Sequence, residues 1–202
     1  MTLANASPSS QLSDDELEVE RAKLETWCTP QEFYNRVDAL AAKFSLEERF
    51  NAPRFAFLRD AMLLSEFALK LGGAKSVRLA TKFDQFPDGF VTTQDNKTLK
   101  VEVTEADHED RRRGDEYKAA GKAKERPSDD SEGVNVISKE LERVIQKKSR
   151  KRYKPKPTLV VWLNLDKQEI QESDVVSVLD DTRSKHAKSF EKIYVLWRQK
   201  VL

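Results

Sequence analysis

Apolar residues recur at helical spacing in the first third of the chain. Between residues 30 and 44, the positions Phe33, Val37, Leu40 and Phe44 form one apolar stripe, which is typical of an amphipathic helix. Residues 53–71 are apolar on nearly every side, and the two glycines that follow are a common helix end. Because a helix that is apolar all round is usually buried, we predict that residues 53–71 form a central, buried helix.

After these glycines the spacing changes to short apolar segments that alternate with polar positions. The pattern predicts strands near residues 76–80, 87–91, 99–106, 159–165 and 193–197, a hairpin turn at 94–97, and helices over 134–152 and 172–187. The segment 159–165 is nearly continuously apolar, which favours a strand buried on both faces. This order predicts an α/β fold with a mixed central sheet flanked by helices.

The region before residue 53 is predicted to add two helices to this domain. Ser13 with Glu16, and Thr29 followed by Pro30, are helix start signals. We expect residues 1–12 to be a disordered lead-in, 13–52 to be a helical cap, and 53–202 to be the α/β domain with a flexible charged insert at 107–133. The two helices either pack on the core or form a solvated, partner-binding arm.

Composition narrows the functional classes. The chain has 202 residues, a formal net charge of +1 and 35% charged residues, so local charge clusters carry more information than the total. The single cysteine, Cys28, leaves no internal disulfide and no Cys pair for zinc. The start lacks the pattern of a secretory signal, and no apolar run approaches the ~20 residues of a membrane span. We expect a soluble, cytoplasmic protein without a membrane partner.

Two carboxylates in the predicted hairpin are the strongest candidates for chemistry. Asp88 opens one strand, and Glu102 lies at the centre of the next, on the opposite face from Val101 and Val103. Pairing of these strands would bring Asp88 and Glu102 to one edge of the sheet. Two converging carboxylates suit magnesium or manganese, which bind through oxygen ligands. Ordinary surface carboxylates are the alternative interpretation.

Two helical residues are candidates to join this pair. Glu66 lies within the apolar helix 53–71, either as a third metal-binding carboxylate or as a partner of Arg59 or Lys70. Lys148 stands where the apolar stripe of helix 134–152 would place another apolar residue.

Residues 143–156 contain eight basic residues and no acidic one. Such a run would attract a phosphate backbone, and Tyr153 within it could stack on an exposed base. A solvated helix end is the alternative. The nucleic-acid candidates are Arg143, Lys147, Arg150, Lys151, Arg152 and Lys154.

The order of elements and these residues together resemble the PD-(D/E)XK nuclease superfamily, which has the restriction-endonuclease-like fold. Pro87-Asp88 matches the PD of the motif and Glu102-Val103 its acidic residue and spacer, whereas Thr104 stands at the lysine position. The resemblance implies catalytic roles for Asp88, Glu102 and Glu66, with a metal held by these three carboxylates. It also implies that the lysine has migrated to the following helix, as Lys148, with Lys147 or Lys139 as substitutes.

Three functional hypotheses follow. The first is a magnesium-dependent endonuclease that hydrolyses DNA, and RNA is the alternative substrate. The second, favoured by Thr104, is a catalytically inactive member that binds nucleic acid or protein. The third is an interaction protein that recruits partners through its N-terminal helices and long insert.

Overall fold

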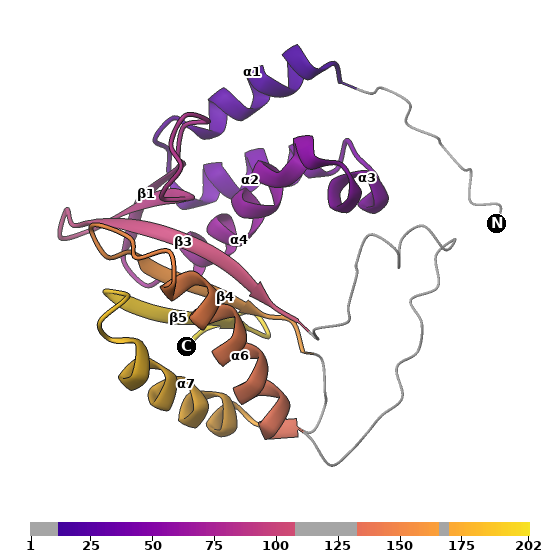
Figure 1. Cartoon of the computed structure of the whole chain (residues 1–202). Coiled ribbons are helices and arrows are strands. Elements are labelled where there is room, and N and C mark those ends of the chain that lie inside the picture. Colours follow the sequence, from indigo (N-terminus) through magenta and orange to yellow (C-terminus); the bar gives the residue numbers. More distant parts are fainter. Residues whose placement is uncertain (1–11, 108–132, 166–169) are drawn as a thin grey trace.

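A six-stranded mixed sheet forms the centre of the computed structural model, which describes residues 12–107, 133–165 and 170–202 (Figure 1). The strands follow chain order: β1 (Ala74–Leu79), β2 (Gly89–Thr93), β3 (Thr98–Ala106), β4 (Thr158–Leu163), β5 (Lys192–Trp197) and β6 (Lys200–Val201). The pairs β3–β4 and β4–β5 are parallel, and the other three pairs are antiparallel. The predicted α/β class with a mixed sheet is confirmed. The short edge strand β6 was not predicted.

Helices lie on both faces of this sheet (Figure 1). One layer contains α1 (Asp14–Leu24), α2 (Pro30–Ala41), α3 (Leu46–Asn51), the 3-10 turn η1 (Pro53–Phe55) and α4 (Ala56–Lys70). The other contains α6 (Gly133–Ser149) and α7 (Glu172–His186). No helix in the described ranges has the length and apolarity needed to cross a bilayer. Most of the predicted insert, residues 108–132, lies outside the described residues, as does most of the lead-in.

Side-chain caps fix where the N-terminal helices begin. Ser13 and Glu16 form the predicted capping box of α1, and Thr29 caps α2 through Glu32. A third capping box, Ser45 with Glu48, starts the short helix α3, which the hydrophobic pattern did not indicate. Each box satisfies backbone N–H groups that have no partner within the helix.

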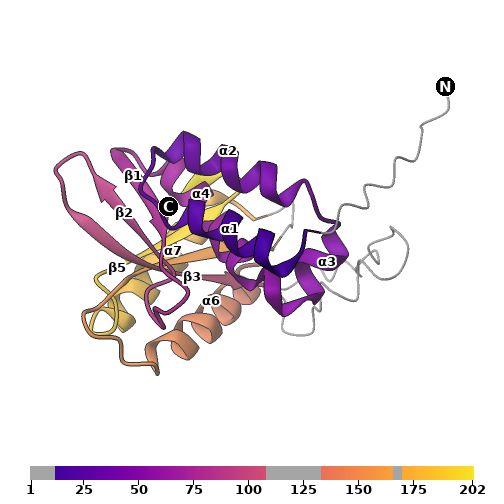
Figure 2. The ribbon, with the colours of Figure 1, turned by 90° about the horizontal axis from the view of Figure 1, so that it is seen from above.

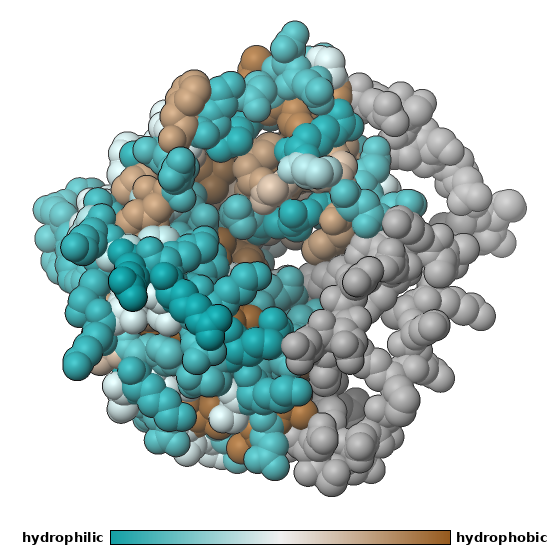
Figure 3. Space-filling model, in the orientation of Figure 1, coloured by the Kyte–Doolittle hydropathy of each residue, from teal (hydrophilic) through white to brown (hydrophobic). Residues whose placement is uncertain are grey.

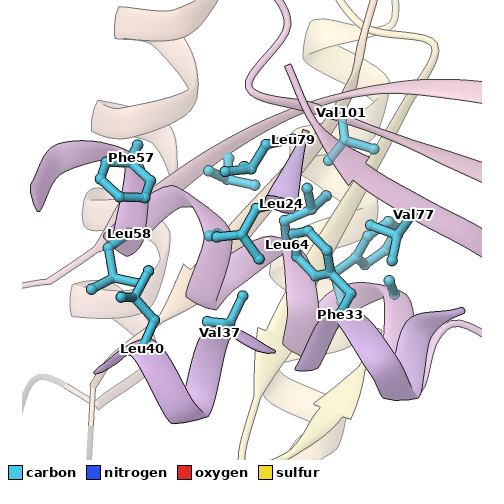
Figure 4. Close-up of a cluster of buried hydrophobic side chains, with 14 of the residues drawn as sticks. Leu24, Phe33, Val37, Leu40, Phe57, Leu58, Leu64, Val77, Leu79 and Val101 are labelled. Carbon is cyan, nitrogen blue, oxygen red and sulfur yellow. The ribbon is translucent and has the colours of Figure 1, made fainter. Parts of the chain in front are cut away.

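The first apolar core joins the N-terminal helices to α4 and the sheet (Figure 4). Leu24 of α1 and Phe33 of α2 are fully or almost fully buried, as are Leu58 and Leu64 of α4. They pack in one cluster that includes Val77 of β1. The N-terminal helices therefore pack on the core, and they are not a solvated arm.

The second core lies between the sheet and α6 with α7. Ile137, Leu141 and Ile145 form the predicted apolar stripe of α6, and all three are fully buried. They pack with β4 residues such as Leu159, while Val160 of the same strand belongs to the first core. Strand β4 is thus buried on both faces, as its continuous apolar sequence predicted.

Alternation along β3 determines which side chains reach each core. Leu99, Val101 and Val103 belong to the first core, on the α4 side. Glu102 therefore projects from the opposite face, toward the layer that contains α6. The β2–β3 hairpin extends away from α6, so the sheet continues past this helix (Figure 2).

Candidate active site

Asp88 lies where the pairing of β2 with β3 ends. The last Cα partners there are Gly89 and Val101, so the next N–H of β3 on this side, that of Val103, has no strand partner. Asp88 Oδ2 accepts that N–H at 2.8 Å. Its own carbonyl accepts the N–H of Ala80 at 3.1 Å, which ties it to β1 as well. The Asp88 side chain is thereby fixed beside β3.

The close approach of α4 to this turn depends on Gly89. A Cβ atom at this position would lie 2.3 Å from Leu64 Cδ2 and 2.9 Å from the carbonyl oxygen of Arg78. Only glycine lets Leu64 pack this closely on the start of β2. The helix face that carries Leu64 is therefore pressed against the strand end that carries Asp88.

Glu102 is a buried carboxylate whose two oxygen atoms differ in their hydrogen-bond partners. Its residue is 2% exposed. Oε1 lies 2.8 Å from Lys148 Nζ and 3.5 Å from Lys151 Nζ, and it accepts the hydroxyl hydrogen of Tyr153. Oε2 is buried and has no hydrogen-bond partner within the described part of the chain. An unpaired buried carboxylate oxygen is costly, so Oε2 is available to a further electropositive group.

Lys148 connects the two carboxylates. It lies in the last turn of α6, three residues after Ile145 and four after Val144, and so continues the buried stripe of that helix. Its side chain is 16% exposed, and Nζ lies 2.8 Å from Glu102 Oε1 and 3.9 Å from Asp88 Oδ2. A cation at a helix C-terminus also interacts favourably with the helix dipole. The structure thus brings together three of the four predicted catalytic side chains.

The fourth candidate, Glu66, is not part of this cluster. It forms an ion pair with Lys70 one turn along α4, and it lines a separate surface cavity with Tyr34 and Trp162. The partnership with Lys70 is the alternative that the sequence left open. Within residues 12–107, 133–165 and 170–202, no three His, Cys, Asp or Glu side chains are grouped as a metal centre. The metal set of Asp88, Glu102 and Glu66 is therefore not assembled.

Asp60 is the acidic residue that α4 directs toward the site instead. It lies one turn before Leu64, the residue that packs on Gly89. Burial first, and then the neighbouring Asp88 carboxylate, raise the pKa of Asp60 to about 7 against the opposing effect of Lys148. Burial, and then Glu102, also hold the pKa of Asp88 above its ordinary value. These shifts identify a set of mutually interacting acids gathered around one lysine.

The sequence signal for Asp60 was its place next to Ala61 and four residues before Leu64. Glu66 lies six positions after Asp60, which amounts to about 120° around an α-helix and about 9 Å along it. The two carboxylates consequently project from different faces of α4. The sequence identifies α4 as buried, but it does not indicate which face is turned toward Asp88.

Tyr153 has a role that its sequence context did not suggest. Its ring stacks on Phe86, with centroids 4.5 Å apart and planes at 28°, and Lys151 Nζ lies 5.6 Å from the ring centroid. Its hydroxyl group donates to Glu102, and burial together with this hydrogen bond raises the pKa of the phenol. The ring therefore packs against Phe86 at the site, and its stacking on a nucleic-acid base stays a prediction.

The predicted nucleic-acid residues comprise one half-buried arginine with partners in the same chain and several exposed cations. Arg143 donates to Glu140 at 2.6 Å and to the carbonyl of Asp107 at 3.0 Å, so it serves the structure of α6. The exposed members are Lys147, Arg150, Lys151, Arg152 and Lys154. They follow the C-terminal end of α6 and the next loop, a hydrophilic region of the surface in Figure 3. This cationic surface borders Glu102, because Lys151 belongs to both.

Charge, burial and hydrogen bonding at this site suit a reaction that involves an anionic phosphate. The carboxylates offer oxygen ligands, the lysine offers a cation and a proton, and the surrounding cations offer phosphate contacts. No protein-family model, curated protein or solved structure matches the chain.

Proposed function

We propose that the protein is a metal-dependent nuclease of the PD-(D/E)XK type that hydrolyses DNA phosphodiester bonds. The observation that carries this proposal is the position of Lys148, whose Nζ lies 2.8 Å from Glu102 and 3.9 Å from Asp88. The motif lysine is replaced by Thr104, and Lys148 would take its place from the helix α6. The fold supports the proposal through its order of α4, a three-stranded meander, α6 and β4.

The oxygen atoms at the site fit Mg²⁺ or Mn²⁺ as the cofactor. Asp88 and Glu102 would hold it, with Glu102 Oε2 as the oxygen that has no partner in the described structure. The Val103 carbonyl would assist, since its N–H faces Asp88 and both groups of a strand residue point to the same side. When bound, the ion would act as a Lewis acid on the phosphate and make water a stronger nucleophile at neutral pH.

The protein side chains would perform the remaining steps. Lys148 would orient the attacking water and stabilise the negative charge that develops on the phosphoryl oxygens. Tyr153 holds the Glu102 carboxylate in place through its hydroxyl group. Asp60, with its pKa of about 7, would exchange a proton near neutral pH, which suits a general acid or base.

The exposed cations beside the site support DNA as the substrate. Lys147, Arg150, Lys151, Arg152 and Lys154 form a surface without an intervening acidic residue in sequence. Each contact with a phosphate would release a counterion, so binding would weaken steeply as salt is raised.

A nuclease assay tests the proposal directly. Linear and supercoiled DNA are incubated with Mg²⁺ or Mn²⁺, using wild type, Asp88→Asn, Glu102→Gln and Lys148→Met. We expect hydrolysis by wild type and losses of at least ~100-fold in each variant. Lys185→Met, an exposed substitution on α7, is the matched control for charge. Wild-type activity in both carboxylate variants would exclude the assignment.

A catalytically inactive nucleic-acid-binding module is the second candidate. The observation that favours it is the convergence of Lys148, Lys151 and Tyr153 on the single oxygen Oε1 of Glu102, which already satisfies that oxygen without a metal. Calorimetry with Mg²⁺ and Mn²⁺ distinguishes the candidates. Heat of metal binding that Glu102→Gln abolishes supports the nuclease, whereas DNA binding with no metal binding supports the inactive module.

A further inference from the structure

The sheet face that carries Glu102 continues over β2 and β1 as a row of basic and aromatic side chains. Arg78 of β1 is the Cα partner of Phe90 in β2, and Phe90 is the partner of Lys100 in β3. Their neighbours Val77, Val91 and Leu99 are buried in the first core, so the row projects from the opposite face. Lys100 lies two residues before Glu102 on that same face.

Trp27 extends this row at the edge of the sheet. Cys28 pairs with Val77 through both backbone hydrogen bonds, at 3.2 and 2.9 Å, and this bridge fixes Trp27 beside β1. The Arg78 guanidinium lies 4.2 Å from the ring centroid of Phe90 and 5.2 Å from that of Trp27. Trp27 nevertheless remains 43% exposed. A large aromatic side chain is thus held in place with much of its surface in solvent.

Two side chains of the row, Arg78 and Lys100, are cationic, and the other two are aromatic. The other side chains on this face are neutral, and they are Ser76, Thr92 and Thr98. Neither Arg78 nor Lys100 forms an ion pair with any residue of the described ranges. Before Glu102, no carboxylate belongs to this face of the three strands. Such a surface complements a polyanion.

We propose that this row, comprising Trp27, Arg78, Phe90 and Lys100, binds single-stranded DNA and leads it to the Asp88–Glu102 site. An exposed aromatic ring stacks on a base, and bases expose their faces when they are not in a duplex. Arg78 and Lys100 contact the phosphates. With strands spaced about 4.8 Å apart, the row from Trp27 to Lys100 crosses about 14 Å. The step that leads the bound DNA to the Asp88–Glu102 site rests on the proposed function, whereas the binding of DNA by the row does not.

Fluorescence anisotropy measures this binding without turnover. The probe is a labelled single-stranded DNA of about a dozen nucleotides, titrated with the full chain in EDTA, beside the matched duplex. The variants are Trp27→Leu and Lys100→Ala. Lys200→Ala on β6 is the control, since it removes the same charge from an exposed side chain at the opposite edge of the sheet. Circular dichroism checks that each variant is folded.

We expect Trp27→Leu to weaken single-strand binding about 5- to 100-fold, and Lys100→Ala to reduce the magnitude of the salt slope by about 0.7. Lys200→Ala retains wild-type affinity. Unchanged affinity in folded Trp27→Leu and Lys100→Ala would overturn the inference, as would equal loss of duplex and single-strand binding. Binding is measured in EDTA, which prevents metal-dependent hydrolysis, and cleavage is measured separately with Mg²⁺ or Mn²⁺. A protein that binds DNA through this row but does not cleave it with either metal refutes the nuclease proposal alone.

Discussion

Lys148 Nζ lies 2.8 Å from Glu102 Oε1, and this contact joins β3 and α6 through two residues that are 46 positions apart in sequence. Glu102 is buried in the middle of β3, and Lys148 ends the buried stripe of α6. A buried carboxylate is stable only when a cation or hydrogen-bond donors accompany it. The same pair therefore serves folding and the proposed chemistry, and stability measurements reveal it even without a substrate.

Replacing Lys148 by methionine is expected to lower the free energy of unfolding by about 2–4 kcal/mol, because it leaves the Glu102 charge buried with fewer partners. Urea unfolding at pH 7 in EDTA measures the change. The double variant Lys148→Met with Glu102→Gln should recover part of the loss, since the unpaired charge is then gone. Lys185→Met on α7 should stay within about 0.5 kcal/mol of wild type. Glu102→Gln alone completes the cycle, and a double-variant loss equal to the sum of the two single losses would show that no such coupling exists.

The raised pKa of Asp60 predicts that the free energy of unfolding declines as pH rises toward neutrality. Its pKa is raised from 3.8 to about 7 in the folded protein, so between these values the folded state holds a proton that the unfolded state has released. Stability consequently falls as pH increases through this interval, and it levels off above about 7.

Asp60→Asn should remove this decline. We expect the variant to be more stable than wild type by about 1–3 kcal/mol at pH 8 and to differ little from it at pH 4. Urea unfolding in EDTA across this range measures the effect. Glu66→Gln, on another face of the same helix, should keep the wild-type pH profile. A wild-type profile in Asp60→Asn would show that Asp60 ionises normally.

The close packing around Gly89 leaves no space for a larger residue at the strand end that carries Asp88. In Gly89→Ala the new methyl group would meet Leu64 Cδ2 and the Arg78 carbonyl oxygen, so α4 and β2 must separate. We expect a loss of about 1–3 kcal/mol in unfolding free energy. Gly72→Ala is the matched control, because a Cβ there has no atom within 4 Å. Thermal unfolding compares the two, and equal stability would show that the packing adapts freely.

The sequence predicted the elements whose signals are local and left open those that depend on how elements rotate against each other. The capping box of Ser13 with Glu16 and the Thr29–Pro30 helix start are each complete within four residues, and the two faces of β3 follow from its alternation. Lys148 was found because it interrupts an apolar stripe. The choice between Asp60 and Glu66 required the rotation of α4, which the contact between Leu64 and Gly89 sets and no spacing encodes.

The contacts of Tyr153 were even harder to predict from the sequence. It follows α6 in a turn where Arg152 adopts a left-handed backbone with φ of 50°, and this turn folds the ring back onto Phe86. A basic neighbourhood suggested contact with nucleic acid, but the nearest electronegative partner was a buried carboxylate of the same chain. Local charge thus indicated the exposed cations, but it did not indicate that the hydroxyl group of Tyr153 contacts Glu102.

Tyr153→Phe tests the hydroxyl group alone, since the phenyl ring can still stack on Phe86. Loss of a hydrogen bond to a charged group should lower the unfolding free energy by about 1–3 kcal/mol. If the hydroxyl positions Glu102 for metal binding, affinity for Mn²⁺ in calorimetry should fall as well. Tyr34→Phe, in the separate cavity that Glu66 lines, should change neither quantity. Unchanged stability and metal affinity in Tyr153→Phe would mean that Lys148 and Lys151 fix the carboxylate without the hydroxyl group.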